Sequence, residues 1–117
     1  MTTQVIPSGT STSQAADASI TSEVIDTDNK GLRIGTMGFQ VNSVGFNAAD
    51  ATVKIQASNT LTAGDFIDVT DGSITIATGT AVANLTPIIY LAMRYYRIVY
   101  TKVSNTAGTI KVTVNML

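Results

Sequence analysis

Two segments of the chain alternate apolar and polar residues almost without error: residues 51–58 (ATVKIQAS) and residues 109–115 (TIKVTVN). Successive side chains of a β-strand point to opposite faces, so this period of two predicts two strands that are each buried on one face. The residues expected to face a core are Val53, Ile55, Ala57, Ile110, Val112 and Val114. The residues expected to face outward are Thr52, Lys54, Gln56, Thr109, Lys111 and Thr113.

Residues 94–102 (RYYRIVYTK) predict a third strand of the same kind. The face expected to join the core holds Tyr96, Ile98 and Tyr100, and the opposite face holds Tyr95, Arg97, Val99 and Thr101. Large rings fill the interior of a sandwich well, so core packing is the favoured interpretation for Tyr96 and Tyr100. Tyr95 alternates with Arg97 on the other face, which makes these two residues candidates for an intermolecular contact.

Less regular segments predict the remaining strands. Residues 19–27 predict one strand. A second is expected to start at residues 32–34, to be interrupted or bulged at Gly35 and Gly38, and to resume at residues 39–44. Residues 66–70 and 73–77 flank Asp71-Gly72, a pair favoured in two-residue turns, so they predict a β-hairpin. Residues 81–83 predict a short edge strand. Residues 88–93 do not alternate, which leaves a buried strand and a single helical turn both open.

No stretch of ten or more residues has the 3.6-residue stripe of a helix. About eight short strands with regular turn signals predict an all-β fold, an antiparallel β-sandwich or jelly roll. The length of 117 residues suits one such domain, which we place at residues 19–117.

Residues 1–18 predict a polar N-terminal arm, because this segment has no periodicity and little to bury apart from Val5 and Ile6. We expect a neighbouring subunit to hold the arm, which makes Val5 and Ile6 interface candidates. The alternative is that the arm packs along its own domain.

The composition narrows the classes of partner. Charged residues make up 13% of the chain, against about 25% in an ordinary globular domain, and hydroxyl and amide side chains provide most of the polar surface. The net charge of −1 and the scattered basic residues argue against nucleic-acid binding. The longest apolar run, residues 88–93, is too short to span a bilayer, and the N-terminus lacks the pattern of a signal peptide, so no membrane association is expected.

The chain carries no recognisable catalytic equipment, since it has neither histidine nor cysteine. Asp65, Asp68 and Asp71 are close in sequence, but turn chemistry already explains their positions and nothing resembles a base that would activate a serine. Residues 26–31 resemble the start of a calcium loop, yet Lys30 occupies a ligand position. We therefore expect no enzymatic activity, no metal and no cofactor.

The order of strands and turns along the chain resembles that of a known protein family. Residues 53–59 (VKIQASN), 66–69 (FIDV), 95–101 (YYRIVYT) and 108–114 (GTIKVTV) are similar in cadence to the small β-sandwich virion proteins of tailed bacteriophages. These are capsid decoration or auxiliary proteins and related fibre and tail modules. The resemblance covers about residues 39–117 and consists of strands and turns rather than an invariant motif.

The resemblance implies a non-enzymatic structural protein on the outside of a virion that is assembled in the host cytoplasm. Its implied partners are copies of itself, with a trimer as the common state, and another virion protein such as the major capsid protein. Decoration of the capsid, through the arm and the sheet edges, is the preferred hypothesis. The alternative is a carbohydrate-binding or receptor-binding module of a fibre or tail, in which Tyr95 with Asn59 or Asn105 would contact the ligand.

Overall fold

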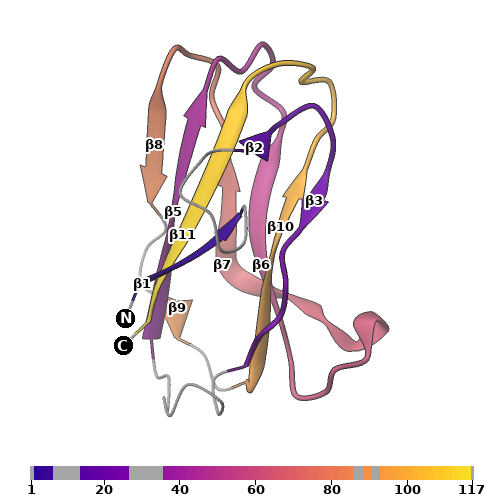
Figure 1. The fold of residues 1–117 in the computed structure, drawn as a ribbon. Coiled ribbons are helices and arrows are strands. Elements are labelled where there is room, and N and C mark those ends of the chain that lie inside the picture. The colour runs from indigo at the N-terminus through magenta and orange to yellow at the C-terminus, as the bar shows by residue number, and fades with distance from the viewer. Residues whose placement is uncertain (1, 7–13, 27–35, 86–88, 91–92, 117) are drawn as a thin grey trace.

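Two antiparallel β-sheets packed face to face make up the protein, as the computed structural model shows (Figure 1). The structure describes residues 2–6, 14–26, 36–85, 89–90 and 93–116. The predicted all-β sandwich is confirmed. The described residues form eleven strands, of which four have only two residues, against about eight expected from sequence.

One sheet has six strands, in the order β1-β11-β5-β8, with β2 paired to β11 and β9 paired to β5. Its strands are β1 (Thr2–Ile6), β2 (Gln14–Ala15), β5 (Thr36–Val44), β8 (Val82–Leu85), β9 (Ile89–Tyr90) and β11 (Thr109–Met116). The expected edge strand at residues 81–83 corresponds to β8, and residues 89–90 of the ambiguous 88–93 segment are a strand.

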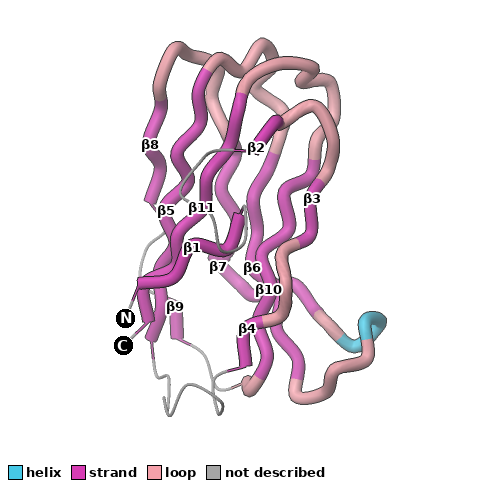
Figure 2. Tube along the Cα trace, in the orientation of Figure 1, coloured by secondary structure: helices cyan, strands magenta, loops and turns pink. Residues whose placement is uncertain are grey.

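The other sheet has five strands, in the order β3-β10-β6-β7, with β4 also paired to β10. Its strands are β3 (Ile20–Thr21), β4 (Ile25–Asp26), β6 (Thr52–Ser58), β7 (Ile67–Thr75) and β10 (Tyr95–Thr101). A single 3-10 turn, η1 (Ala63–Asp65), lies at the tip of the loop that projects from this sheet between β6 and β7 (Figure 2). None of the helices in the described ranges has the length and hydropathy needed to cross a bilayer.

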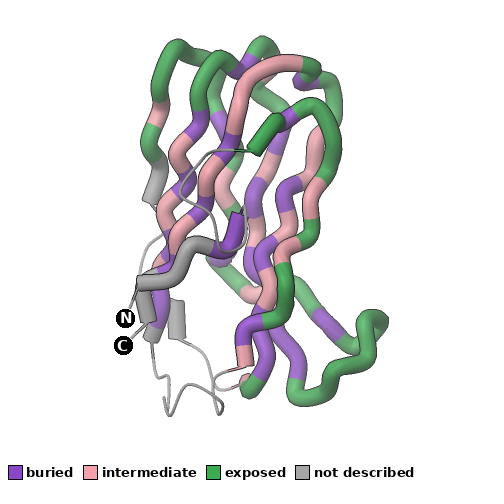
Figure 3. Tube along the Cα trace, viewed as in Figure 1, coloured by how far each residue is buried: buried purple, intermediate pink, exposed green. Residues whose placement is uncertain are grey.

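The core lies between the sheets and follows the predicted alternation. Buried and partly exposed residues alternate along β6, β10 and β11 (Figure 3). All the residues expected to face inward are buried: Val53, Ile55, Ala57, Tyr96, Ile98, Tyr100, Ile110, Val112 and Val114. Core packing of Tyr96 and Tyr100 is therefore confirmed.

The N-terminal segment is part of the sandwich, so the expectation of an arm held by another subunit is wrong for the residues described there. β1 pairs antiparallel with the C-terminal strand β11, and β2 pairs with the other end of β11. Val5 and Ile6 are 1% and 0% exposed inside their own domain. For residues 2–6 the structure has the alternative, packing along the same domain, and burial of these two aliphatic side chains stabilises that packing. Residues 7–13 lie outside the described chain.

The predicted hairpin at Asp71-Gly72 is also wrong. Residues 67–75, which include most of both expected arms, form the one strand β7 and pair with β6: Asp68 lies opposite Gln56, and Ser73 lies opposite Lys54. The four residues 69–72 therefore face the single residue Ile55, which is a large β-bulge. Asp71 has a positive φ of 62° there, and a Cβ on Gly72 would overlap the Ile55 side chain. The turn-forming pair forms a bulge in one strand instead of reversing the chain.

Two smaller expectations change. Gly38 does not interrupt its strand, because β5 continues through it and Gly38 pairs with Asn115 of β11. The strand expected at residues 19–27 is split into β3 and β4, and Ser22 between them bonds Ile98 of β10 through both its amide and its hydroxyl. Residues 27–35, which include the calcium-like loop after Asp26, fall outside the described residues.

Asn105 organises one end of the sandwich and is completely buried. Its Nδ2 donates to the carbonyls of Ala16 and Ala107 at 3.1 and 2.8 Å, and its Oδ1 accepts from the amide of Asn47 at 2.9 Å. The Tyr100 hydroxyl donates to the same Ala16 carbonyl at 2.8 Å. These bonds satisfy buried backbone groups of three loops, which gives Asn105 a structural role.

Candidate functional site

A row of hydrogen-bonded polar side chains crosses the outer face of the five-stranded sheet; we call Lys54, Gln56, Asp68 and Arg97 the polar row. Gln56 of β6 lies between Arg97 of β10 and Asp68 of β7 in the register of the strands. Arg97 Nε donates to Gln56 Oε1 at 2.8 Å, and Gln56 Nε2 donates to Asp68 Oδ1 at 2.8 Å. Lys54 Nζ completes the row with an ion pair to Asp68 Oδ2 at 3.1 Å.

The row ends against the loop that carries η1. The guanidinium of Arg97 lies over the Phe66 ring, with Cζ 4.4 Å from the ring centroid, and it approaches the Ala63 carbonyl at 3.4 Å. Within the loop, the Thr60 hydroxyl donates to Asp65 Oδ2 at 2.6 Å. The alternation in residues 94–102 indicates that Arg97 faces outward but does not indicate its partners, because only the strand order brings Gln56 and Asp68 beside it.

The bonds of the row lower the pKa of Asp68 below its ordinary value, and the side-chain amide of Gln56 contributes most, followed by the ammonium of Lys54. We therefore expect Gln56→Leu to raise the Asp68 pKa more than Lys54→Met does. A carboxyl whose pKa is depressed in the folded state stabilises the fold above its unfolded pKa, and this contribution is lost as the pH falls through the folded pKa. Carboxyl-carbon NMR titration of both variants measures the effect, and a larger rise in Lys54→Met would contradict it.

The three carboxylates singled out in the sequence are not assembled into a catalytic pair. Asp65 bonds Thr60, Asp68 belongs to the polar row, and Asp71 sits in the bulge. Over the described ranges, no group of three or more acidic residues converges as a metal site would require.

No aromatic ring whose side chain is described forms an exposed platform. The six rings are at most 8% exposed: Phe39, Phe46, Phe66, Tyr95, Tyr96 and Tyr100. Burial raises the pKa of both Tyr96 and Tyr100. Tyr95, an expected interface residue, is covered by the Arg94 guanidinium at 4.9 Å, so its ring is not available to a partner.

The amides proposed to accompany Tyr95 are also in use. Asn105 lies at the opposite end of β10 from Tyr95 and holds the three loops described above. Asn59 accepts a hydrogen bond from the backbone amide of Arg94 at 3.2 Å. Of the four interface candidates, Val5, Ile6 and Tyr95 are thus buried, and only Arg97 presents part of its side chain to solvent.

Charge is divided unequally between the two sheets. The strands of the six-stranded sheet contain one charged residue, Lys111 of β11. The strands of the five-stranded sheet contain five: Asp26, Lys54, Asp68, Asp71 and Arg97. The outward side chains that the structure describes on β5 and β11 therefore carry a single charge, and the others are hydroxyl, amide or aliphatic groups: Gln40, Asn42, Val44, Thr109, Lys111 and Thr113. No reading of single strands reveals this, because it depends on which strands share a sheet.

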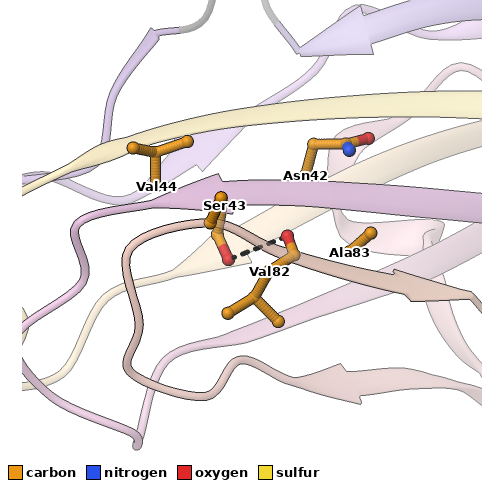
Figure 4. A pocket seen from close by; sticks show the side chains of 6 residues that line it. Asn42, Ser43, Val44, Val82 and Ala83 are labelled. Carbon is orange, nitrogen blue, oxygen red and sulfur yellow. Dashed lines mark hydrogen bonds between the residues drawn. The ribbon is translucent and has the colours of Figure 1, made fainter.

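A shallow depression of about 160 Å³ lies on the six-stranded sheet between β5 and its edge strand β8 (Figure 4). Asn42 and Val44 of β5 line it together with Ala81 and Ala83 on the β8 side. Ser43 and Val82, which pair across the two strands, complete its lining. The depression exists because alanines stand opposite the larger side chains of β5.

Comparison with known proteins defines the fold. Neither a protein-family model nor a curated protein matches the sequence. The K1 cleaved adhesin domain of Lys-gingipain from Porphyromonas gingivalis W83 is similar in structure, with a TM-score of 0.54, 15% identity, and coverage of 90% of this chain and 72% of that domain. The CBM36-1 domain of a multidomain xylanase from the hindgut metagenome of Trinervitermes trinervoides has a TM-score of 0.55 and 9% identity, with coverage of 98% and 95%. At these identities the similarity shows that the chain has a β-sandwich fold of the kind seen in adhesin and carbohydrate-binding domains.

Proposed function

We propose that this protein is a non-enzymatic structural module that docks on a larger protein assembly through the outer face of its six-stranded sheet. The observation that carries the proposal is the segregation of charge, which leaves that face with Lys111 as the single charged residue of its strands. Charged residues are depleted at the centres of protein interfaces, because each buried charge must be desolvated and paired. The face with the polar row has the opposite character.

The assembly we propose is the virion of a tailed bacteriophage, and the role is capsid decoration. The support for this class is the similarity in cadence between residues 39–117 and the small β-sandwich virion proteins. A surface rich in threonine, serine and asparagine and poor in charge suits a protein that is surrounded by copies of itself and by a capsid protein. The contact we now propose is the neutral face, since β1 is occupied within its own sheet.

Two observations support the non-enzymatic part of this proposal: the residue types that the chain contains and the hydrogen bonds that its carboxylates make. The chain contains no histidine and no cysteine. Asp50, a further carboxylate of the described loops, is bonded by the hydroxyl and the amide of Ser104, and these bonds lower its pKa. An ionised carboxylate that is held by hydrogen-bond donors is a poor general base at neutral pH.

The test uses particles that lack the protein, mixed with the purified full-length chain. We expect the wild type to cosediment with particles and to appear as added density in electron microscopy. Lys111→Glu reverses the central charge of the proposed contact face, and it should weaken particle binding at least about tenfold. Lys54→Glu is the matched control on the other sheet and should bind as the wild type does. Failure of the wild type to bind, or equal losses in both variants, would refute the proposal.

A second candidate is a carbohydrate-binding or receptor-binding module of a phage fibre or tail. The observation in its favour is the polar row beside the projecting loop, since planar guanidinium, amide and carboxylate groups suit hydroxyl-rich ligands. The buried rings weaken it, because sugar recognition commonly uses an exposed aromatic face. A glycan array without binding at millimolar concentration would exclude this candidate.

A further inference from the structure

The open edges of the two sheets differ in how they are protected against pairing with another strand. An exposed edge presents unpaired backbone N–H and C=O groups, and proteins usually block it with charges, bulges or short irregular strands. At the outer edge of the five-stranded sheet, β7 carries the large bulge together with Asp68 and Asp71. At the other edge of that sheet, β3 and β4 are two residues each, and the exposed Glu23 lies between them.

The two edges of the six-stranded sheet also differ from each other. β1 has a register irregularity between Gln4 and Ile6. β8, which shares the other edge of the sheet with the two-residue strand β9, has none: its four residues pair regularly with β5, from Val82 opposite Ser43 to Leu85 opposite Gln40. The sequence of β8, VANL, contains no charged residue and no proline. Among the described strands, no other pairs with β8 on its outer side (Figure 1).

We propose that β8 is the contact between two copies of this chain, which pair antiparallel along β8 about a two-fold axis. The backbone groups on the outer side of β8, which pair with no other described strand, select an extended strand as the partner. A two-fold contact requires the same strand on both sides, and β8 is the described edge strand of more than two residues that has neither a charge nor a register irregularity. Because β8 is uncharged, no like charges oppose each other across the axis.

The side chains beside this edge allow the second strand to approach. Ala81 and Ala83 are exposed and small, and they form one wall of the shallow depression next to β5. The pairing would join two six-stranded sheets into one continuous sheet across the dimer. The two neutral outer faces would then lie on the same side of the dimer, which doubles the surface proposed to dock on a particle.

This inference deepens the proposed function, because it names the edge through which copies meet, but it is tested in the free protein. Sedimentation velocity of the full-length chain, from about micromolar to about millimolar concentration, should show a monomer–dimer equilibrium. Ala83→Lys places a charge on the edge of each copy and should raise the dissociation constant at least about tenfold. Ala63→Lys adds the same charge at an exposed site in η1 on the other sheet and should leave the equilibrium unchanged.

Crosslinking gives a second measurement that does not depend on affinity alone. The chain has no cysteine, so Ala83→Cys introduces a unique thiol. Mild oxidation should link Ala83→Cys into a covalent dimer and leave Ala63→Cys monomeric. A monomer at every concentration, a trimer, or an undiminished dimer in Ala83→Lys would overturn the inference. If the monomer still decorates particles, only this inference fails; if the dimer forms but does not bind particles, the proposed function fails and the β8 contact stands.

Discussion

Replacing Val5 and Ile6 together with alanine is expected to lower the free energy of unfolding by about 4 kcal/mol, which is a large part of the total for a domain of this size. Both side chains are buried in the core, although they belong to a segment that is otherwise polar. The substitution removes five methyl or methylene groups and leaves a cavity beside β11, where β1 pairs with Thr113 and Val112. Denaturant unfolding followed by circular dichroism measures the change.

The matched control for this pair is the double substitution Ile67→Ala and Val103→Ala. These residues are 60% and 62% exposed, so the same atoms are removed from solvent-facing positions. A loss of about 1 kcal/mol or less is expected there. If the Val5 and Ile6 variant is no less stable than this control, residues 2–6 do not belong to the core, and the hypothesis of an arm held by another subunit regains its basis.

Gly108→Ala is expected to destabilise the fold by about 3 kcal/mol, because two effects act at this one position. Gly108 has a φ of 89°, which side-chain-bearing residues rarely adopt. A Cβ would also overlap the Val44 carbonyl oxygen and lie 2.9 Å from the carbonyl carbon of Gly45. This close approach of two backbones precedes the pairing of Thr109 with Val44, so the added methyl group must displace the first residues of the β5–β11 ladder.

Gly64→Ala is the control for this prediction. No atom lies within 4 Å of a Cβ built at Gly64, and its φ is not in the positive region. Its free energy of unfolding should change by no more than about 0.5 kcal/mol. Thermal unfolding of both variants separates the cases, and a Gly108→Ala protein as stable as Gly64→Ala would show that the two backbones are not in contact in solution.

The sequence predicts burial correctly in regular strands that have one face on the core and the other in solvent. The alternation in residues 51–58 and 109–115 reports burial directly, so the inward and outward faces of β6 and β11 were predicted residue by residue. The prediction failed where a local signal had more than one tertiary use. Asp71-Gly72 favours a positive φ and a small residue, and these properties serve a bulge over Ile55 as well as a hairpin turn.

The candidate surfaces were less predictable than the fold. Arg97 was recognised as a polar residue on an outward face, but its bonds to Gln56 and its position over Phe66 depend on how β10, β6 and the projecting loop are placed. The neutral face with Lys111 depends in the same way on which strands share a sheet. The interface prediction for Val5, Ile6 and Tyr95 does not hold, because all three side chains are buried. The exposure of a side chain depends on the residues packed around it, and for β1 these belong to β11, which is distant in sequence.

The sequence by itself determined that the chain is an all-β sandwich, which residues of the regular strands face the core, and that the exterior is poor in charge. The first two features follow from the period-two pattern, which can be read within a single strand. The third follows from composition, which does not depend on how the chain folds. Only the tertiary structure decided that residues 2–6 join the core, that β7 bulges, that all but one of the charged strand residues lie in one sheet, and that β8 is an edge strand without charge or irregularity. Each of these depends on which strands pair and in what register, and strand pairing is selected by the combined burial of all strands rather than by any one of them.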